Sequence, residues 1–268
     1  MAKESPPPEF RHAMEEVIEA TIAKGARIVI DAEQWVYQDT IDQWILNWMR
    51  KYNIPSNMTA NGPPIYNTMQ AYLKSTPQRV AEHLKLAQRD NFTLAFKLVR
   101  GAYIVSEKRS LIHDTKSETD QAYDTIIEHL ITESFPGVED PFPAVRFVVA
   151  GHNDTSVERA LAVQQKEVQA GRCPRGLEFG QIQGMADEIT CNLAQMRNRK
   201  STADSDSIEL LPRVYKALSW GTVQELMQNL IRRAIENRAA VERTKEWRHG
   251  LWKELVHRIR RNMPLLSH

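Results

Sequence analysis

The segment from Phe96 to Tyr103, FKLVRGAY, places two cations in a sequence that is otherwise typical of a buried strand. Apolar residues 92–96 (FTLAF) lead into it, and Gly101 follows, where the backbone can bend and admit a close approach. Burying a cation costs free energy unless an anion is close, so Lys97 and Arg100 need an explanation. Either the strand end opens to solvent, or a negatively charged group binds there.

Six apolar segments alternate with longer segments in which apolar residues recur at helical spacing. The expected strands lie within residues 26–34, 63–72, 93–103, 144–154, 177–185 and 213–221. The expected helices cover residues 9–24, 40–53, 76–91 (with Thr76 as N-cap), 118–134, 155–170, 185–199 and a C-terminal helical region over about 222–261. This alternation predicts six strand–helix units, and therefore an α/β fold with a parallel sheet.

Each expected strand ends in polar or charged residues. They are Asp31 and Glu33, Gln70, Lys97 and Arg100, His152 and Asn153, Gln181, and Tyr215 and Lys216. Functional groups at the carboxyl ends of successive parallel strands are typical of a (β/α)8 TIM-type barrel. Neither GxGxxG nor GxxxxGK[ST] occurs in the chain, which argues against a Rossmann or P-loop nucleotide site.

The composition is that of an ordinary globular protein, with 42% hydrophobic and 26% charged residues among 268. A formal net charge of +1 predicts no general attraction to nucleic acid or to an anionic membrane. Two cysteines, Cys173 and Cys191, provide no disulfide framework. Asp31 and Glu33 lack nearby histidines at metal-ligand spacing, so we expect no metal site.

Seven motifs, in order along the chain, resemble the proline dehydrogenase family of flavin-dependent barrel enzymes, most closely its fungal branch. They are VIDAEQ (29–34), YNTMQAYLKSTP (66–77), KLVRGAY (97–103), IHDTKSETDQAYD (112–124), AGHND (150–154), FGQIQGMADE (179–188) and LIRRAIENR (230–238). KLVRGAY followed at a distance by RRxxENR is the most specific part. The resemblance implies one barrel domain over residues 1–268, partial in this chain, with strands 3–8 of the family fold.

The resemblance also implies FAD across the carboxyl end of the barrel. Lys97 would reach the flavin where the reduced ring gains negative charge, and would stabilise the reduced state. The remaining implied cofactor contacts are Gln70, Val99, Arg100, Gly101, Ala102, His152, Gln181 and Glu236.

The implied substrate is L-proline, which the flavin would oxidise to 1-pyrroline-5-carboxylate by hydride transfer, the first step of proline catabolism. Arg232 and Arg233 would hold its carboxylate from two sides, because adjacent helical residues point about 100° apart. Asp31 would pair with the first arginine. The implied ring contacts are Tyr103, Ile182, Tyr215 and Asn229, and the implied catalytic residues are Lys97, Asp31 and Tyr215.

Two alternatives stay open. Asn229 stands where the family usually has a tyrosine, which favours hydroxyproline or another cyclic amino acid as substrate. Since strands 1 and 2 of the family barrel have no counterpart in the chain, a non-catalytic paralogue is the other alternative.

The family also implies a quinone-type electron acceptor and a mitochondrial location. No targeting peptide is recognisable in the chain, so a cytoplasmic location is the alternative. The basic amphipathic segment 248–261 is compatible with peripheral contact at a membrane surface.

Overall fold

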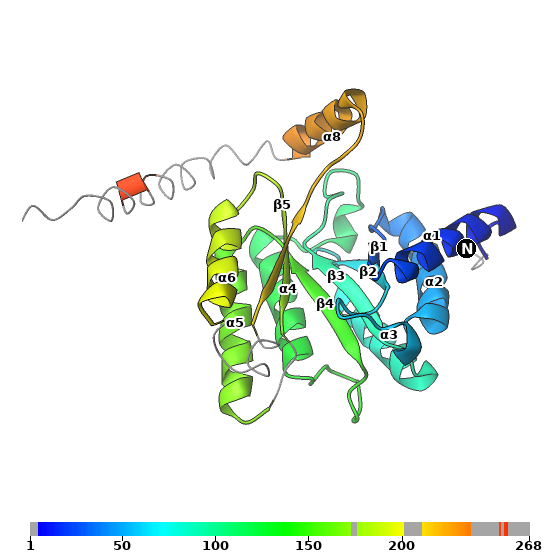
Figure 1. Ribbon diagram of the computed structural model, residues 1–268, viewed down its shortest axis with the longest axis horizontal. Helices are drawn as coiled ribbons and strands as arrows, with labels where there is room; N and C mark the ends of the chain where they lie inside the picture. The colour runs from blue at the N-terminus through cyan, green and yellow to red at the C-terminus, as the bar shows by residue number, and fades with distance from the viewer. Residues whose placement is uncertain (1–4, 173–175, 201–210, 237–251, 253–254, 257–268) are drawn as a thin grey trace, which may run out of the picture.

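Six parallel strands form one sheet, in the same order in space as along the chain. The computed structural model describes residues 5–172, 176–200, 211–236, 252 and 255–256. The strands are β1 (Ile28–Val29), β2 (Ile65–Gln70), β3 (Leu94–Val99), β4 (Val145–Ala150), β5 (Glu178–Ile182) and β6 (Arg213–Ala217). The sheet curls, and helices cover its outer face (Figure 1).

The helices alternate with the strands, which confirms the predicted α/β architecture of a partial TIM-type barrel. They are α1 (Pro8–Ala23), α2 (Trp35–Tyr52), α3 (Thr76–Asp90), α4 (Lys116–Ile131), α5 (Asp154–Gln169), α6 (Asp187–Lys200) and α8 (Val223–Glu236), with short 3-10 turns at Pro55–Asn57 and Arg109–Leu111. The expected helical region continues to 261, but most of it beyond residue 236 lies outside the described residues. No helix in the described ranges is long and apolar enough to cross a membrane.

The start of α2 and the N-cap of α3 differ from the sequence expectation. Helix α2 begins at Trp35 rather than at residue 40, because a carboxylate oxygen of Glu107 accepts a hydrogen bond from the Trp35 backbone N–H at 2.7 Å. That cap comes from 72 residues away, so local spacing cannot reveal it. Thr76 is the first helical residue of α3, not its N-cap, and its hydroxyl donates to the Gln70 carbonyl at 2.5 Å.

Alternation along β3 separates two environments. Leu94, Phe96 and Leu98 are fully buried in the main core, where the outer face of the sheet meets α2 to α6. Ala95 and Lys97 point to the concave face, since successive strand side chains alternate. The strand register puts Tyr66 and Val148 on that face too, and Tyr66, Ala95 and Val148 form a small apolar cluster there.

A buried amide joins the helix layer to the start of the sheet. Asn53, fully buried at the end of α2, donates from Nδ2 to the carbonyl oxygens of Ile65 (2.8 Å) and Thr93 (3.1 Å). Its Oδ1 accepts from the Ile65 N–H at 3.1 Å. One side chain therefore satisfies backbone groups at the starts of both β2 and β3.

We expect Asn53→Ala to lower the free energy of unfolding by about 2–4 kcal/mol, because three hydrogen bonds are lost and a buried N–H is left without a partner. Urea denaturation measures the change. The matched control is Asn47→Ala on the exposed side of α2, where the effect should stay within about 0.5 kcal/mol. Equal losses in the two variants would contradict the role given to Asn53.

Candidate active site

The two cations of the FKLVRGAY segment lie on opposite faces of the sheet. Lys97 points to the concave face, where its Nζ lies 2.5 Å from Oδ1 of Asp31. The side chain of Asp31 is 78% exposed and that of Lys97 is 26% exposed, so this ion pair stands at an opening rather than in a closed interior. The Lys97 ammonium group thus lies where a ligand at the carboxyl end of the strands can reach it.

Arg100 faces the helices instead. Its Nε lies 2.5 Å from Oδ1 of Asp120 on α4, its Nη2 donates to Ser156 on α5 at 2.8 Å, and its Cζ lies 4.2 Å from the ring centre of Tyr123. The protein's own groups therefore balance this cation. The guanidinium of Arg100 therefore does not lie on the concave face. Only the backbone of Arg100 could make the implied cofactor contact, and that contact stays a prediction.

Asp120 accepts from two cations, since Lys116 Nζ lies 2.5 Å from its other carboxylate oxygen. Burial opposes the charged form, but the hydrogen bonds from Lys116 and Arg100 outweigh it and hold the pKa of Asp120 below its usual value. The ionised form of Asp120 is thus favoured by folding.

Gly101 sets the path of the chain after β3. Its φ is +139°, and a Cβ at this position would lie 2.1 Å from Cδ1 of Tyr72, so only glycine fits without displacement. The following segment then folds back against residues 33–35. Tyr103 donates its hydroxyl to Glu33 at 2.9 Å, and Tyr72 donates to Glu107 at 3.3 Å.

Other predicted residues also reach the carboxyl end of the sheet. The Gln70 amide donates to the Glu33 carbonyl at 3.0 Å. His152 Nε2 accepts from the Ile182 N–H at 3.1 Å, which places the proton of a neutral ring on Nδ1. Val99 ends β3 partly buried, and Ala102 is exposed.

Gln181 lies on the other side of the sheet. It is 2% exposed, and its Oε1 accepts from Thr190 of α6 at 3.1 Å. A side chain packed against a helix does not reach the concave face, so the implied cofactor contact from Gln181 is not supported by this geometry.

Arg27, which the sequence interpretation did not select, occupies the concave face below the strand ends. Its Nη1 lies 2.5 Å from Oε2 of Glu178 and donates to the Tyr66 hydroxyl at 3.1 Å. Its Cζ lies 5.1 Å from the ring centre of Tyr66 and 4.9 Å from that of Tyr215. No local motif marks Arg27, because its partners come from three distant strands.

Four predicted residues lie on helix α8, whose side chains are only partly described. Arg232, Arg233, Asn229 and Glu236 are placed there as backbone, and their side chains lie outside the described part of the structure. Helix α8 follows the carboxyl end of β6 and stands beyond the ends of the strands (Figure 1). The implied pairing of Asp31 with the first arginine therefore stays a prediction.

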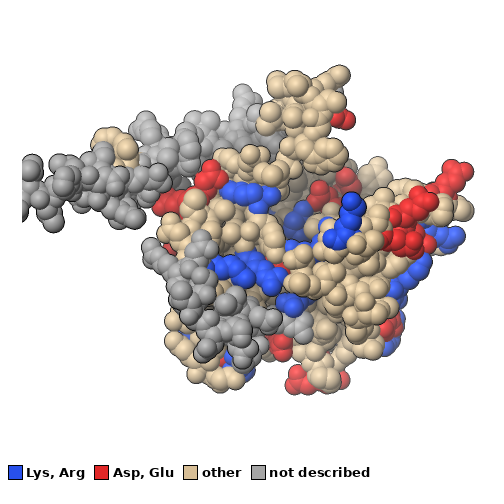
Figure 2. All heavy atoms as spheres, viewed as in Figure 1, with Lys and Arg blue, Asp and Glu red and all other residues tan. Residues whose placement is uncertain are grey.

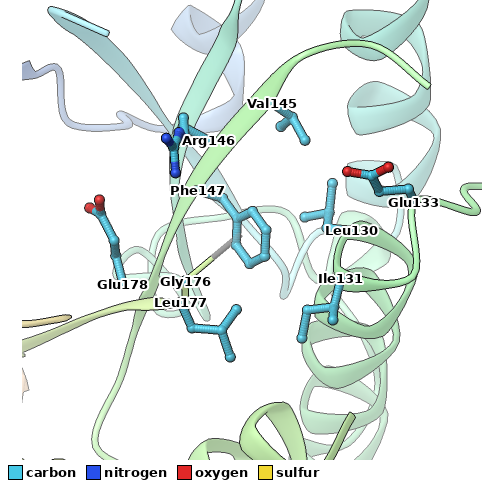
Figure 3. A pocket seen from close by; sticks show the side chains of 9 residues that line it. All are labelled: Leu130, Ile131, Glu133, Val145, Arg146, Phe147, Gly176, Leu177 and Glu178. Carbon is cyan, nitrogen blue, oxygen red and sulfur yellow. The ribbon is translucent and has the colours of Figure 1, made fainter. Parts of the chain in front are cut away.

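Basic side chains gather over the strands in the space-filling view, whereas acidic ones lie mainly towards the edges (Figure 2). A pocket of about 30 Å³ lies elsewhere, at the amino ends of β4 and β5 against the end of α4. Figure 3 shows that Phe147, Leu130 and Ile131 face one another there, while Arg146 and Glu178 point away. This small apolar pocket belongs to the packing of the core, not to the strand-end site.

Asp120→Asn should lower stability at pH 7 by roughly 0.5–1 kcal/mol, a modest value because solvent screens a partly exposed pair. Since the pKa of Asp120 is lowered by folding, its contribution is fully present above the usual carboxyl pKa near 4 and is lost as pH falls through the lower folded value. The difference in free energy of unfolding between wild type and Asp120→Asn should thus stay constant from pH 7 to about 5 and shrink below about 4. Urea denaturation at each pH measures it. Asp114→Asn, on an exposed pair with Lys74, is the control and should change the free energy of unfolding at pH 7 by less than about 0.5 kcal/mol.

Gly101→Ala should lower the free energy of unfolding by more than backbone strain alone would, which is about 1–3 kcal/mol, because the new methyl group also collides with Tyr72. Gly171→Ala shows the cost of left-handed backbone without a collision, since Gly171 has a positive φ (+75°) and nothing within 4 Å of an added Cβ; the φ of +139° at Gly101 adds strain of its own to the collision. Thermal unfolding should show a clearly larger loss for Gly101→Ala, with faster proteolysis within residues 101–111. Similar losses in both variants would contradict the collision.

Comparison with known proteins identifies the family of the chain. The family model for proline dehydrogenase matches residues 3–246. Proline dehydrogenase 1, mitochondrial, of Caenorhabditis elegans is 32% identical over 94% of this chain and 39% of its own length. The probable proline dehydrogenase, mitochondrial, of Schizosaccharomyces pombe is 34% identical over 88% of this chain and 47% of its own length. The chain therefore spans less than half the length of these curated relatives.

Among solved structures, proline utilization A from Bdellovibrio bacteriovorus, inactivated by N-propargylglycine, superposes with a TM-score of 0.64 at 21% identity. The match covers 85% of this chain and 21% of that protein, and it supports the barrel-type fold. Because the family model covers most of the chain and the motif residues gather at the carboxyl ends of the strands, this chain belongs to the proline dehydrogenase family.

Proposed function

We propose that the chain oxidises L-proline to 1-pyrroline-5-carboxylate with FAD as cofactor, at the carboxyl end of the curled sheet. Family membership supports the reaction class. The observation that carries the assignment to this site is Lys97, a partly exposed ammonium group on the concave face, oriented by Asp31.

The residues at this end suit an electron-rich cofactor. Lys97 offers positive charge, Gln70 offers a buried amide, and Gly101 lets the backbone pass where a side chain would collide. When bound, FAD would supply the acceptor for two electrons. The carboxylate of the substrate would be held by Arg232 and Arg233 of α8, as the family resemblance implies.

Oxidation removes a hydride from the ring carbon next to nitrogen and a proton from that nitrogen, leaving a C=N bond. Lys97 would stabilise negative charge as it develops on the acceptor, and the interaction gains strength where water is excluded. Asp31 holds the Lys97 ammonium in place through their short contact. Tyr103, Ile182 and Tyr215 would pack around the substrate ring.

The names of the relatives support a mitochondrial location. A quinone-type electron acceptor is what the family resemblance implies. Both are proposals for this chain. Hydroxyproline as substrate remains the alternative favoured by Asn229, so the assay below compares the two amino acids.

Lys97→Met should lower kcat for proline roughly 100-fold or more, because one preorganised charge at the acceptor is removed, whereas Lys97→Arg should retain much of the rate. The measurements are the flavin absorbance of the purified protein and dye reduction dependent on proline or 4-hydroxyproline. Lys74→Met is the control, since Lys74 pairs with Asp114 on the surface and should leave kcat within about twofold.

Wild-type protein that carries no flavin and reduces no dye with either amino acid would contradict the proposal and favour a non-catalytic paralogue. Faster reduction with 4-hydroxyproline would instead correct the substrate.

A further inference from the structure

Arg27 reaches across the concave face from the first strand to the last. It lies directly before β1, yet its guanidinium contacts Glu178 at the start of β5 and the ring of Tyr215 in β6. In a barrel the strands tilt and are staggered, so residues that are not register partners come to the same height. Tyr66 of β2 lies at that height too, and the four side chains form one layer beneath the strand ends.

The guanidinium is fixed on several sides. The side chains of Arg27 and Glu178 are 14% and 7% exposed, and the two atoms of their ion pair are 2.5 Å apart. Burial opposes the charge of Arg27, but Tyr66 and Glu178 outweigh it and raise the pKa of Arg27. Burial in turn raises the pKa of Tyr66 to about 12, so its hydroxyl stays protonated at neutral pH.

We propose that Arg27 is a positioning residue that fixes the ring of Tyr215 under the amino-acid site. Glu178 and Tyr66 hold the guanidinium, and the guanidinium holds the face of the Tyr215 ring at 4.9 Å. Tyr215 is 36% exposed, so it still offers surface to a ligand. The inference rests on the proposed function, because the contact of Tyr215 with the substrate comes from the family resemblance.

A positioning role differs measurably from a structural one. If Arg27 only joined β1 to β5, its loss would lower stability without changing how Tyr215 responds to a ligand. If it positions the ring, its loss moves Tyr215 and weakens substrate binding together. Lysine tests the geometry, since it keeps a positive charge near Glu178 but lacks the planar group that stacks on an aromatic ring.

The experiment uses the full chain labelled with 3-fluorotyrosine, in which the fluorine NMR signal of Tyr215 is identified by its loss in Tyr215→Phe. Proline is titrated into wild type, Arg27→Met and Arg27→Lys. We expect Arg27→Met to shift the Tyr215 signal and to weaken proline binding roughly 3- to 10-fold. Arg27→Lys should give a signal shift and a proline affinity between those of wild type and Arg27→Met. Should Arg27→Met fold poorly, Arg27→Met/Glu178→Met removes both buried charges and serves instead.

Arg50→Met is the matched control. Arg50 also pairs with a carboxylate, Asp90 at 2.6 Å, and also lies over an aromatic ring, Phe92 at 5.8 Å, but it belongs to α2 in the helix layer. Its loss should lower stability and leave both the Tyr215 signal and proline binding unchanged.

An unchanged Tyr215 signal in folded Arg27→Met would overturn the proposal, as would a shifted signal with unchanged proline binding. Wild type that shows no response to proline would overturn the proposed function. In that case the Tyr215 signal of Arg27→Met still decides whether Arg27 holds the ring.

Discussion

The cations of the sheet cannot be buried without anions, and this constraint organises the structure around them. Each of four strand-associated cations meets a carboxylate from another element: Arg27 with Glu178, Lys97 with Asp31, Arg100 with Asp120, and Lys216 with Asp187. Removing one partner of a buried pair leaves an uncompensated charge, which costs far more than the pair contributes. The pairs thus tie strands to one another and to their helices.

The pairs divide the cations by task. On the outer face, Arg100 and Lys216 join β3 and β6 to the helices. Their charges are balanced by the carboxylates of Asp120 and Asp187. On the concave face, Lys97 pairs with a carboxylate that is itself largely exposed. A charge held in this way is oriented but still available to a ligand, which is what the cofactor proposed for the strand ends would require.

The layer beneath the strand ends explains how a site on loops and strand ends can be precise. Arg27 and Glu178 form a polar floor between the strands, and Gly101 fixes the path of the loop above it. Glu107, in this loop, accepts hydrogen bonds from the Trp35 backbone N–H at the start of α2 and from the Tyr72 hydroxyl. The loop is therefore attached to the segment that carries Asp31. The positions of the proposed site residues therefore depend on two sets of long-range contacts, one in the layer beneath the strand ends and one in the loop after β3.

Much of this protein could be predicted from its sequence. The alternation of apolar and helical segments determined six strand–helix units, because hydrophobic periodicity reflects which face each element buries. The motifs indicated the family, but the sequence interpretation placed both Lys97 and Arg100 at the cofactor. In the structure the Arg100 side chain faces the helices, because strand side chains three residues apart lie on opposite faces. The start of α2 was misplaced because its cap, Glu107, is distant in the chain.

Only the tertiary structure decided which carboxylate meets which cation. Asp31 and Asp120 are 66 and 20 residues from their partners, and no local pattern encodes such distances. It also separated Gln181, packed on α6, from the strand-end residues that reach the concave face. Arg27 is the clearest case, because barrel tilt and stagger, and not any spacing in the sequence, bring it to Tyr215.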